Sequence, residues 1–534
     1  MTHKLELETI HTAKAGTSKG AGPMAVDGHT TRLKTVAASP ASYFHMGNAL
    51  RGENRLDDAI SCYQRAVSLA PVFAEAYNNM GLVFQEKGDL EASIHCFQKA
   101  LESNPKLFHA YFNMGVSFKD REDVNDAVFC FQKALLLRPK LSSAYNRLGT
   151  IFREQGKLDK ALFCFKKELE IDPKNAQAYN NLGSTFYDTG AVSEAVRCFQ
   201  NSLRLRPDHV ETHWNLSLAH LALGNYAEGW CGYEYRFKRN SHRPSFPEQL
   251  GIPRWDGTSF VGKRLLVLEE QGLGDNLQFV RYLPMVKARG GTVLLKTDKR
   301  LLNLFRGIEG LDEIEAWPSD TMPSVDFDFY IPMMSLPWIF GTTLATIPAR
   351  VPYIRPDQQK VDAWRERING KGMKVGLVWA CSPTSPTELI SSRGRSCHLM
   401  HFLPLSRIPG ISLYGLQKGE AAGQVRELCS HHGHIINLGE AFEDFSDTAA
   451  AIANLDLMIS IDTSVAHLSG AMGKPTWLLL QSVSDFRWLR QREDSPWYPT
   501  MRLFRQERPG HWAGVIGRVC SEVRSRLSRG PGTP

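Results

Sequence analysis

Small, aromatic and proline positions recur every 34 residues along the first half of the chain. In the first five units a tyrosine precedes the glycine by four positions, and a proline closes the unit. The glycine or serine column consists of Gly47, Gly81, Gly115, Gly149, Gly183 and Ser217. Small residues let two helices approach closely, aromatic residues fill the gap between units, and proline ends the second helix. The spacing therefore predicts six helix–turn–helix units over residues 40–240.

This register resembles the tetratricopeptide repeat family. The resemblance implies an all-α superhelix whose groove, lined by the first helix of each unit, holds a protein partner or an extended peptide. One asparagine column would line that groove: Asn79, Asn113, Asn181 and Asn215. A carboxamide carries a donor and an acceptor, so the column can bind a peptide backbone, as a similar ladder does in O-linked N-acetylglucosamine transferases. Asparagine is also frequent in this column of ordinary repeats, so a purely structural role stays open.

The rhythm of the chain changes after residue 240. A proline-containing linker over 241–261 leads into short apolar segments that alternate with helical stretches. The expected strands are Arg264–Glu269, Thr292–Lys296, Phe327–Ile331, Lys374–Trp379, Ile411–Leu416, His434–Leu438, Leu455–Ile461 and Thr476–Leu480. Such alternation predicts parallel sheets covered by helices. We expect two Rossmann-like lobes, residues 262–355 and 356–525, followed by a tail over 526–534.

The composition is that of an ordinary globular protein: of 534 residues, 43% are hydrophobic and 22% are charged. The longest apolar runs fall well short of the roughly 20 residues that a transmembrane helix needs. Residues 1–39 lack both periodicity and an apolar signal core, so we expect a disordered leader and a cytoplasmic protein. The formal charge of +7 is modest for this length and favours a small phosphate-bearing ligand over a nucleic acid.

Half of the ten cysteines follow the repeat interval: Cys62, Cys96, Cys130, Cys164 and Cys198. Equivalent positions in stacked units are too far apart for a disulfide, which needs Cα atoms within about 7 Å. No Cys-x-x-Cys or cysteine–histidine spacing typical of a metal site occurs either. We therefore expect these side chains in the core.

The first candidate site is the turn after the first expected strand of the first lobe. Gly272 and Gly274 allow close backbone approach, and Asp275 places a carboxylate at the start of the next helix. A dinucleotide-binding fingerprint would have a third glycine where Leu277 stands, and Asp298 could serve as its ribose-binding acid. A nicotinamide-dependent enzyme therefore stays an alternative.

The second candidate site follows a strand of the second lobe. Asp462, Thr463 and Ser464 lead into a helix of small residues, and His467 lies one turn further on. Hydroxyl groups and backbone N–H groups at the start of a helix form a seat for phosphate. This turn therefore predicts a site for a phosphate-bearing ligand.

Together the two turns resemble the heptosyltransferases of lipopolysaccharide synthesis, which form glycosyltransferase family 9. Their first lobe carries a Gly-Asp turn and their second an Asp-Thr-Gly-x-x-His turn, in which Ser464 here replaces the glycine. The resemblance covers most of residues 254–520. It includes Trp379, the basic stretch Arg393–Ser396 and the segment Leu416–Gly419.

The resemblance implies a two-lobed GT-B glycosyltransferase that inverts the anomeric centre. Asp275 would deprotonate the acceptor hydroxyl, and the second turn would hold the diphosphate of the donor. The expected donor-binding residues are Gly272, Gly274, Arg395, Lys418, Asp462, Thr463, Ser464 and His467. Trp488 is a further candidate, because it lies in an Arg-, Trp- and Pro-rich segment after the last expected strand. For Arg395 and Lys418 a solvated surface role stays open, as core packing does for Trp488.

Helix dipoles and basic side chains can stabilise a departing diphosphate, so we expect no metal and no cofactor besides the nucleotide-sugar co-substrate. Asp326-Phe-Asp328 does match the Asp-x-Asp motif of metal-dependent transferases, but it begins an apolar strand. A metal reading is also open to the loop histidines His398, His401, His431, His432 and His434. They lack a convincing carboxylate or cysteine companion, which favours exposed histidines.

Three classes of function remain. A protein glycosyltransferase would grip its acceptor in the repeats, because tethering raises the effective concentration of the acceptor hydroxyl. A transferase for lipopolysaccharide or polysaccharide acceptors would use the repeats for docking, and a catalytically silent scaffold would bind proteins only. We favour the first class, with a protein acceptor and a nucleotide sugar as partners.

Overall fold

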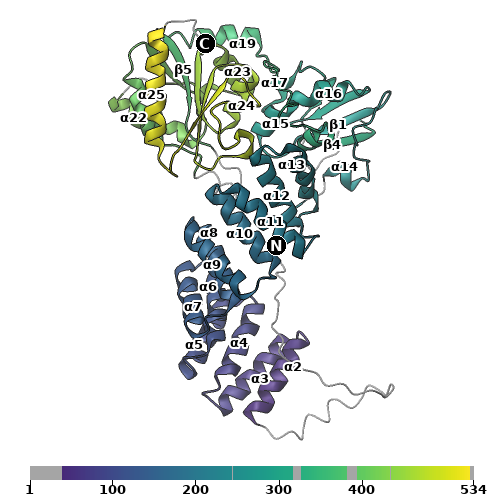
Figure 1. Cartoon of the computed structure of the whole chain (residues 1–534), viewed down its shortest axis with the longest axis vertical. Coiled ribbons are helices and arrows are strands. Elements are labelled where there is room, and N and C mark those ends of the chain that lie inside the picture. The colour runs from purple at the N-terminus through teal and green to yellow at the C-terminus, as the bar shows by residue number, and fades with distance from the viewer. Residues whose placement is uncertain (1–38, 243–244, 317–325, 382–393, 433–434, 530–534) are drawn as a thin grey trace. The chain divides into compact units, whose positions relative to one another are not determined.

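The 34-residue period corresponds to pairs of packed helices. The computed structural model describes residues 39–242, 245–316, 326–381, 394–432 and 435–529, so most of the predicted leader and the last five residues lie outside it. The chain divides into two compact units, residues 1–144 and 145–534. The helices of the first unit are α2 (Pro40–Gly52), α3 (Leu56–Leu69), α4 (Ala74–Glu86), α5 (Leu90–Ser103), α6 (Phe108–Asp120) and α7 (Val124–Leu137) (Figure 1).

Close packing within each pair explains the glycine column. A Cβ atom on Gly81 would lie 2.7 Å from the ring of Phe97, and one on Gly115 would lie 2.9 Å from the ring of Phe131. Both rings are fully buried. The five cysteines at the repeat interval are buried and unbridged, which confirms that they are core residues, whereas Cys231 of α13 lies outside that interval and is exposed.

The repeats continue into the second unit. Their helices are α8 (Ser142–Glu154), α9 (Leu158–Ile171), α10 (Ala176–Thr189), α11 (Val192–Leu205), α12 (Val210–Leu223) and α13 (Tyr226–Tyr233), followed by the 3₁₀ helix η1 (Glu234–Lys238). The predicted helical repeats are therefore present as six helix pairs in the described part of the chain.

The first sheet has four parallel strands in the order β3-β2-β1-β4. They are β1 (Arg264–Leu268), β2 (Thr292–Lys296), β3 (Glu313–Glu315) and β4 (Phe329–Pro332). The accompanying helices are α14 (Phe246–Gln249), α15 (Leu273–Phe279), η2 (Val280–Tyr282), α16 (Leu283–Lys287), α17 (Leu302–Phe305), η3 (Met333–Ser335) and α18 (Leu336–Ile339). The strand order reverses between β1 and β4, so the turn after β1 lies where such sheets bind ligands.

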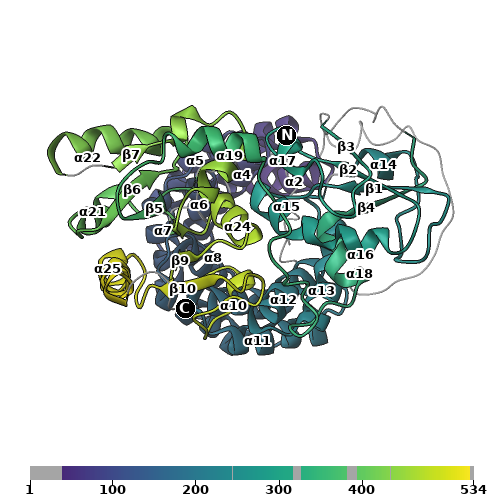
Figure 2. The ribbon, with the colours of Figure 1, turned by 90° about the horizontal axis from the view of Figure 1, so that it is seen from above.

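The second sheet has six parallel strands in the order β10-β9-β8-β5-β6-β7. They are β5 (Met373–Val378), β6 (Ile411–Gly415), β7 (Ile435–Asn437), β8 (Leu457–Ile461), β9 (Thr476–Leu480) and β10 (Met501–Arg505). The accompanying helices are α19 (Gln358–Arg365), η4 (Leu399–Phe402), α21 (Leu403–Ser406), η5 (Glu420–Gly423), α22 (Gln424–His432), η6 (Gly439–Ala441), α23 (Phe445–Ala453), α24 (Ser464–Ala471), η7 (Phe486–Trp488) and α25 (Trp512–Arg529). Helices α21 and α25 cover one face of this sheet, and α24 covers the other (Figure 2). Helix α23 contributes to the same hydrophobic core as α24.

The predicted parallel sheets are confirmed. All eight expected strands are present, each within two residues of its predicted ends. Two strands were not predicted, β3 and β10. Strand β3 has only three residues, two of them glutamates, and β10 lies at the edge of its sheet with two arginines among its five residues.

One hydrophobic core joins the last repeats to both sheets. It contains Phe199 and Trp230 from the repeats, Val267 from β1 and Leu478 from β9, all at most 1% exposed. The sequence suggests a linker over 241–261 between the repeats and the first lobe. In the structure the apolar side chains of the last two repeats are nevertheless shared with the sheets, so this part of the chain packs as one body.

A buried carboxylate lies within the fourth repeat. Glu168 of α9 is 2% exposed, and its oxygens accept hydrogen bonds from Asn146 Nδ2 at 3.0 and 3.1 Å and from Asn175 Nδ2 at 3.1 Å. Burial raises the pKa of Glu168 to about 7, although the Asn146 hydrogen bonds oppose the rise. The folded protein therefore binds a proton at this site over a pH range in which the unfolded chain does not.

We predict that stability falls between about pH 4 and pH 7 through this group, because a carboxyl whose pKa is raised on folding stabilises the fold only while protonated. The change is on the order of 3 kcal/mol. Glu168→Gln should flatten this part of the pH profile of the melting temperature and should melt higher than the parent at pH 8. A parent profile that is equally flat would contradict the shifted pKa.

Candidate functional site

The two predicted turns lie against each other. Helix α15 starts at the turn after β1, helix α24 starts at the turn after β8, and the two helices pack together. A Cβ atom on Gly274 would lie 2.9 Å from Cδ2 of His467 and 3.6 Å from Cα of Ser464. Glycine at position 274 therefore permits this approach. We call residues 272–275 and 462–467, together with Arg487, the turn junction.

Asp275 is held from both sides within the turn junction. One carboxylate oxygen accepts the N–H of Gly272 at 2.9 Å, and the other is paired with Nη2 of Arg487. The side chain of Asp275 is 17% exposed. Burial raises the pKa of Asp275, while the guanidinium of Arg487 and the Gly272 N–H oppose the rise. A carboxylate with a raised pKa is a better proton acceptor than an ordinary surface aspartate.

Arg487 links the two lobes and was not predicted as a site residue. Its Nη1 pairs with Asp485 at 2.8 Å, and its Nε donates to Oε1 of Gln278 on α15 at 2.9 Å. Burial acts to raise the pKa of Asp485, but the charge and hydrogen bonds of Arg487 lower it overall. One buried guanidinium from the loop after β9 thus neutralises two carboxylates, one from each lobe.

His467 is buried and neutral. Its Nδ1 lies 2.9 Å from the Tyr498 hydroxyl, and its ring stacks on Trp488 with centroids 5.2 Å apart. Burial, together with the nearby Arg487, lowers the pKa of His467 to about 3. The side chain therefore has no positive charge to offer an anion. Trp488 is fully buried behind it, so that ring has no exposed face for a ligand and supports His467 instead.

The exposed part of the turn junction is polar. Gln271 and Gly272 are exposed, and Thr463 and Ser464 are half-buried at the start of α24. Thr463 precedes the first helical residue in an extended conformation, with its hydroxyl 3.1 Å from that of Ser460. Asp462 beneath them is 8% exposed. Burial and the neighbouring Asp485 carboxylate raise the pKa of Asp462 to about 6, against the effect of Arg395.

The two predicted cations differ in their surroundings. Arg395 is half-buried, and its Nε is a buried donor without an acceptor among the described residues. Its charge influences Asp462, Asp485 and His467, which places it beside the second turn. Lys418 is exposed at the end of β6, where its Nζ donates to the carbonyl of Phe442. Arg395 is therefore the cation that the structure brings to the turn junction.

A second arginine of the loop after β9, Arg490, packs against the repeats. All three guanidinium nitrogens of Arg490 are buried without an acceptor in the described part of the chain. The guanidinium lies 5.4 Å from the ring centre of Tyr187 on α10. Burial and the charge of Arg490 lower the pKa of the neighbouring Arg505 to about 10. The density of arginine, tryptophan and proline over residues 485–499 was the sequence signal for this loop.

The asparagine column joins neighbouring repeats. In the first unit, Nδ2 of Asn79 donates to Asn48 at 2.8 Å, and Nδ2 of Asn113 donates to Asn78 at 3.0 Å. In the second unit, Asn215 donates to Asn180 at 3.0 Å, whereas Asn181 accepts from Gln177 at 3.0 Å. These carboxamides are half-buried and already bonded within the repeats. Peptide binding by them stays a prediction.

The nicotinamide-dependent and the metal-dependent alternatives rest on Asp298 and on the Asp-x-Asp motif, and these carboxylates form hydrogen bonds away from the turn junction. Asp298 is held by Arg300 through its backbone N–H and its guanidinium, at 2.8 and 2.9 Å. Asp328 accepts the N–H of Arg264 at 2.7 Å, at the amino-terminal end of the parallel strands β1 and β4. The Asp-x-Asp motif therefore lies at the edge opposite Asp275.

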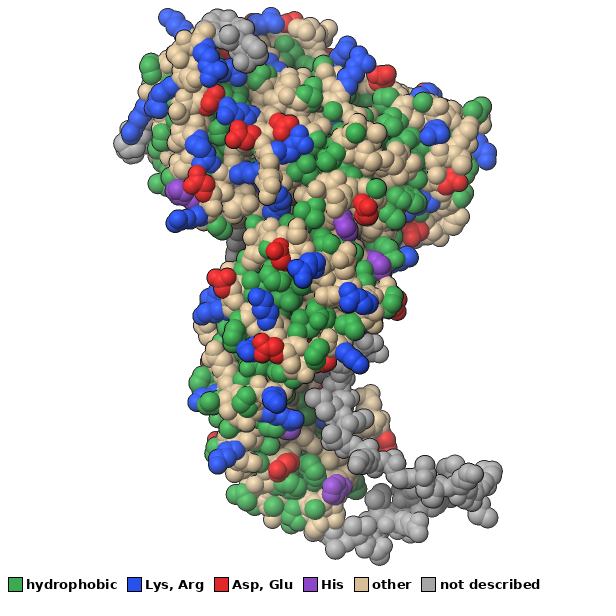
Figure 3. Space-filling view, viewed as in Figure 1, with side chains coloured by type: hydrophobic (Ala, Val, Ile, Leu, Met, Phe, Trp, Pro, Cys, Tyr) green, Lys and Arg blue, Asp and Glu red, His purple; other side chains and the backbone are tan. Residues whose placement is uncertain are grey.

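Neither the surface charge nor a membrane-spanning helix points to a further ligand in the described part of the chain. On the face shown in Figure 3, Lys and Arg side chains are interspersed with Asp and Glu, in keeping with the modest net charge. No helix in the described part of the chain has the length and apolar character required to cross a bilayer.

Comparison with known proteins identifies the helical repeats. The model of the TPR repeat matches residues 47–88 and 149–190. Models of the tetratricopeptide repeat match residues 74–107, 108–141 and 180–239. The chain therefore carries tetratricopeptide repeats, as the sequence register predicts, and such repeats are a scaffold for protein–protein interaction.

One curated relative extends beyond the repeats. The chain is 32% identical over 327 residues to Protein FlbA of Caulobacter vibrioides, which corresponds to 57% of this chain and 53% of that protein. The chain thus spans about half the length of this relative.

Two similar solved structures each match little more than a third of this chain. YrrB, described as a TPR protein with an unusual peptide-binding site, is 25% identical with a TM-score of 0.31; the match covers 35% of this chain and 97% of YrrB. Pseudomonas aeruginosa pilF is 16% identical with a TM-score of 0.35; the match covers 38% of this chain and 91% of that protein.

We predict that Arg487→Met destabilises the protein by about 3–5 kcal/mol, because it leaves the largely buried carboxylate of Asp275 and the partly buried carboxylate of Asp485 without their cation. Chemical denaturation at pH 7 would measure the loss. The control Arg492→Met removes a more exposed pair with Asp494 and should cost at most about 1 kcal/mol. Equal losses in the two variants would contradict a special role of Arg487.

Proposed function

We propose that the two-sheet region is a GT-B glycosyltransferase, which moves a sugar from a nucleotide-sugar donor to a hydroxyl of a protein held by the repeats. The observation that carries the proposal is the turn junction itself. Two turns 187 residues apart, Gly272–Asp275 and Asp462–His467, resemble the paired motifs of one transferase family and lie in contact at the carboxyl ends of their sheets.

The donor diphosphate would bind at the second turn. Thr463 and Ser464 offer hydroxyl and backbone N–H groups at the start of α24, an eight-residue helix whose dipole favours an anion. The buried, unpartnered Nε of Arg395 supports an anionic ligand there, because a buried donor without an acceptor is costly. His467 is neutral and would support the turn through its packing rather than through charge.

Asp275 would act as the base. The acceptor oxygen attacks the anomeric carbon, the hydroxyl proton passes to the Asp275 carboxylate, and the bond to the diphosphate breaks with its electron pair on the leaving phosphate. Configuration at the anomeric carbon inverts. The raised pKa of Asp275 suits a proton acceptor, and its hydrogen bond from Gly272 holds the carboxylate in place.

The acceptor would be a protein because the repeats and the sheets share one core. A chain bound to the last repeats is thereby held at a fixed distance from Asp275, which raises the local concentration of its hydroxyl groups. A lipopolysaccharide or polysaccharide acceptor would use the same chemistry, and an acceptor screen separates the two.

A scaffold without transferase activity is the second candidate. Two observations favour this scaffold. Asp275, the proposed base, is already engaged in an ion pair with Arg487. Ser464 also replaces the glycine that the heptosyltransferase motif has at this position. The two candidates differ in one respect that can be measured directly, which is the binding of nucleotide sugars.

We predict that one nucleotide sugar from a panel linked to UDP, GDP, ADP, CMP and dTDP raises the melting temperature, because a ligand that binds only the folded state stabilises it. Thr463→Ala combined with Ser464→Ala should abolish that shift. NAD and NADP serve as controls for the nicotinamide alternative. Absence of a shift with every sugar nucleotide would favour the scaffold.

We predict that Asp275→Asn lowers transfer by about 10²–10⁴-fold, the usual contribution of a general base, while donor affinity stays within threefold. Asp485→Asn removes the other carboxylate partner of Arg487 and controls for the lost ion pair. It should retain transfer within tenfold. Activity of Asp275→Asn equal to that of Asp485→Asn would remove Asp275 as the base.

A further inference from the structure

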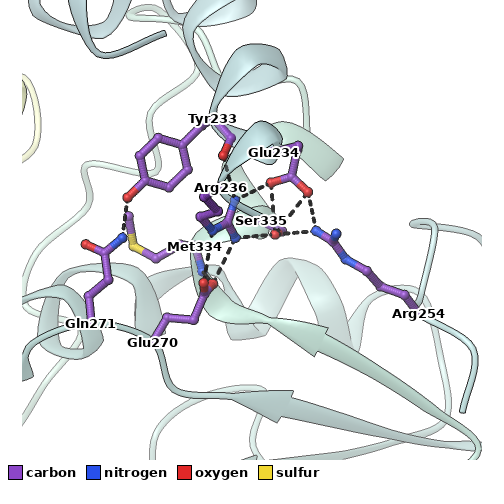
Figure 4. A network of polar contacts seen from close by, with 8 residues as sticks. All are labelled: Tyr233, Glu234, Arg236, Arg254, Glu270, Gln271, Met334 and Ser335. Atoms are coloured by element: carbon purple, nitrogen blue, oxygen red, sulfur yellow. Dashed lines mark hydrogen bonds and ion pairs between the residues drawn. The ribbon is translucent and has the colours of Figure 1, made fainter. Parts of the chain in front are cut away.

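The turn that carries Asp275 is held by the end of the repeats. Arg236 of η1 forms a two-bonded ion pair with Glu270, with Nε to Oε1 at 3.0 Å and Nη2 to Oε2 at 2.9 Å (Figure 4). Glu270 follows β1 and lies two residues before Gly272. The last helical segment of the repeats thus contacts the candidate site directly, through a charged group that is itself 9% exposed.

A second contact restrains the next residue. Gln271 has a φ of +58°, a left-handed backbone that a residue with a side chain seldom adopts. Its Nε2 donates to the hydroxyl of Tyr233, the last residue of α13 (Figure 4). The phenol ring of Tyr233 is buried at 2% exposure and packs against Phe486 and Trp230. A rigid side chain of the repeats therefore holds a strained position of the turn.

The network also includes the end of β4. Nη2 of Arg236 donates to the Ser335 hydroxyl at 2.7 Å, and the N–H of Met334 donates to Oε2 of Glu270 at 3.1 Å. Glu234 pairs with Nη1 of Arg236 at 2.6 Å. Segments that follow β1 and β4 are thus joined through the residues that end the repeats (Figure 4).

Outside the turns between repeat helices, Gln271 and Leu489 are the non-glycine residues with left-handed backbone in the described part of the chain. Both border the turn junction: Gln271 precedes Gly272, and Leu489 follows Arg487 by two residues. Strained backbone persists where the surroundings hold it, and it gathers at functional sites. The restraint on Gln271 comes from outside the lobe to which it belongs.

We propose that Tyr233 and Arg236 are positioning residues, which set the conformation of the turn that carries Asp275. The repeats would then do more than hold an acceptor, because their last segment completes the site. The role assigned to Asp275 rests on the proposed function, whereas the restraint on the turn can be measured without any activity.

The test uses hydrogen exchange in the full-length protein. Tyr233→Phe removes the acceptor of Gln271 Nε2 and keeps the buried ring. Tyr235→Phe is the matched control, because it is the same substitution two residues away on a side chain that stacks on His213. Amides in the peptide 269–279 should exchange at least tenfold faster in Tyr233→Phe and within twofold of the parent in Tyr235→Phe. Equal exchange in the two variants overturns the proposal.

A second variant addresses the ion pair. Arg236→Lys keeps the charge beside Glu234 and Glu270 but loses the two-bonded contact, so exchange of the same peptide should rise at least threefold with little change in the melting temperature. Unchanged exchange would remove Arg236 from the proposal.

Kinetics then separate this proposal from the proposed function. If the parent transfers sugar, Tyr233→Phe should lower kcat about tenfold and leave the donor Kd unchanged, because the donor turn lies on the other lobe. An unchanged kcat would overturn the positioning of Asp275. If the parent transfers nothing while exchange still differs between the two tyrosine variants, the proposed function fails and the structural coupling stands.

Discussion

The arrangement of the second unit depends on one hydrophobic core that the last repeats and both sheets share. Side chains from the fifth and sixth repeats, from one face of the four-stranded sheet and from one face of the six-stranded sheet are buried together. Burial of apolar area is the dominant stabilising term in folding, so separation of these parts would expose surface on all of them at once. From α10 onward the repeats therefore pack against the sheets, and the candidate site lies within that packed region.

Charges at the turn junction follow from this burial. Asp275 and Asp462 are brought largely out of water beside the more exposed Asp485, which is tolerable because Arg487 pairs with Asp275 and Asp485, and the charge of Arg395 acts on Asp462. The same burial keeps His467 neutral, with a pKa of about 3. The site thus combines two carboxylates whose pKa values are raised, those of Asp275 and Asp462, with a half-buried helix start at Thr463 and Ser464.

The fold was predictable where it follows from periodic patterns in the local sequence. A 34-residue interval requires identical packing in every unit, and buried parallel strands appear as short apolar runs, so both could be recognised. Strand β3 was not predicted because its residues Glu313–Glu315 are half-buried and mostly charged.

Within the site, glycines and acids after strands marked both turns. Arg487 could not be assigned to Asp275 in advance, because 212 residues separate them and only the folded chain brings them together. Tyr233 and Arg236 could not be assigned for the same reason, because only the folded chain brings them to Gln271 and Glu270.

The shared core also constrains how a ligand can enter. In a two-lobed protein whose lobes are joined only by a linker, the lobes can rotate apart to admit a substrate. Here the repeats pack on both lobes, with Trp230 against Phe279 of the first and Phe486 of the second, and Arg487 pairs across them. Wide opening would break these contacts together. The exposed residues at the turn junction are Gln271 and Gly272, with Thr463 and Ser464 half-buried beside them, so a ligand would meet the site from this side. The loop after β9 also packs on the repeats, because the guanidinium of Arg490 lies 5.4 Å from the ring centre of Tyr187 on α10.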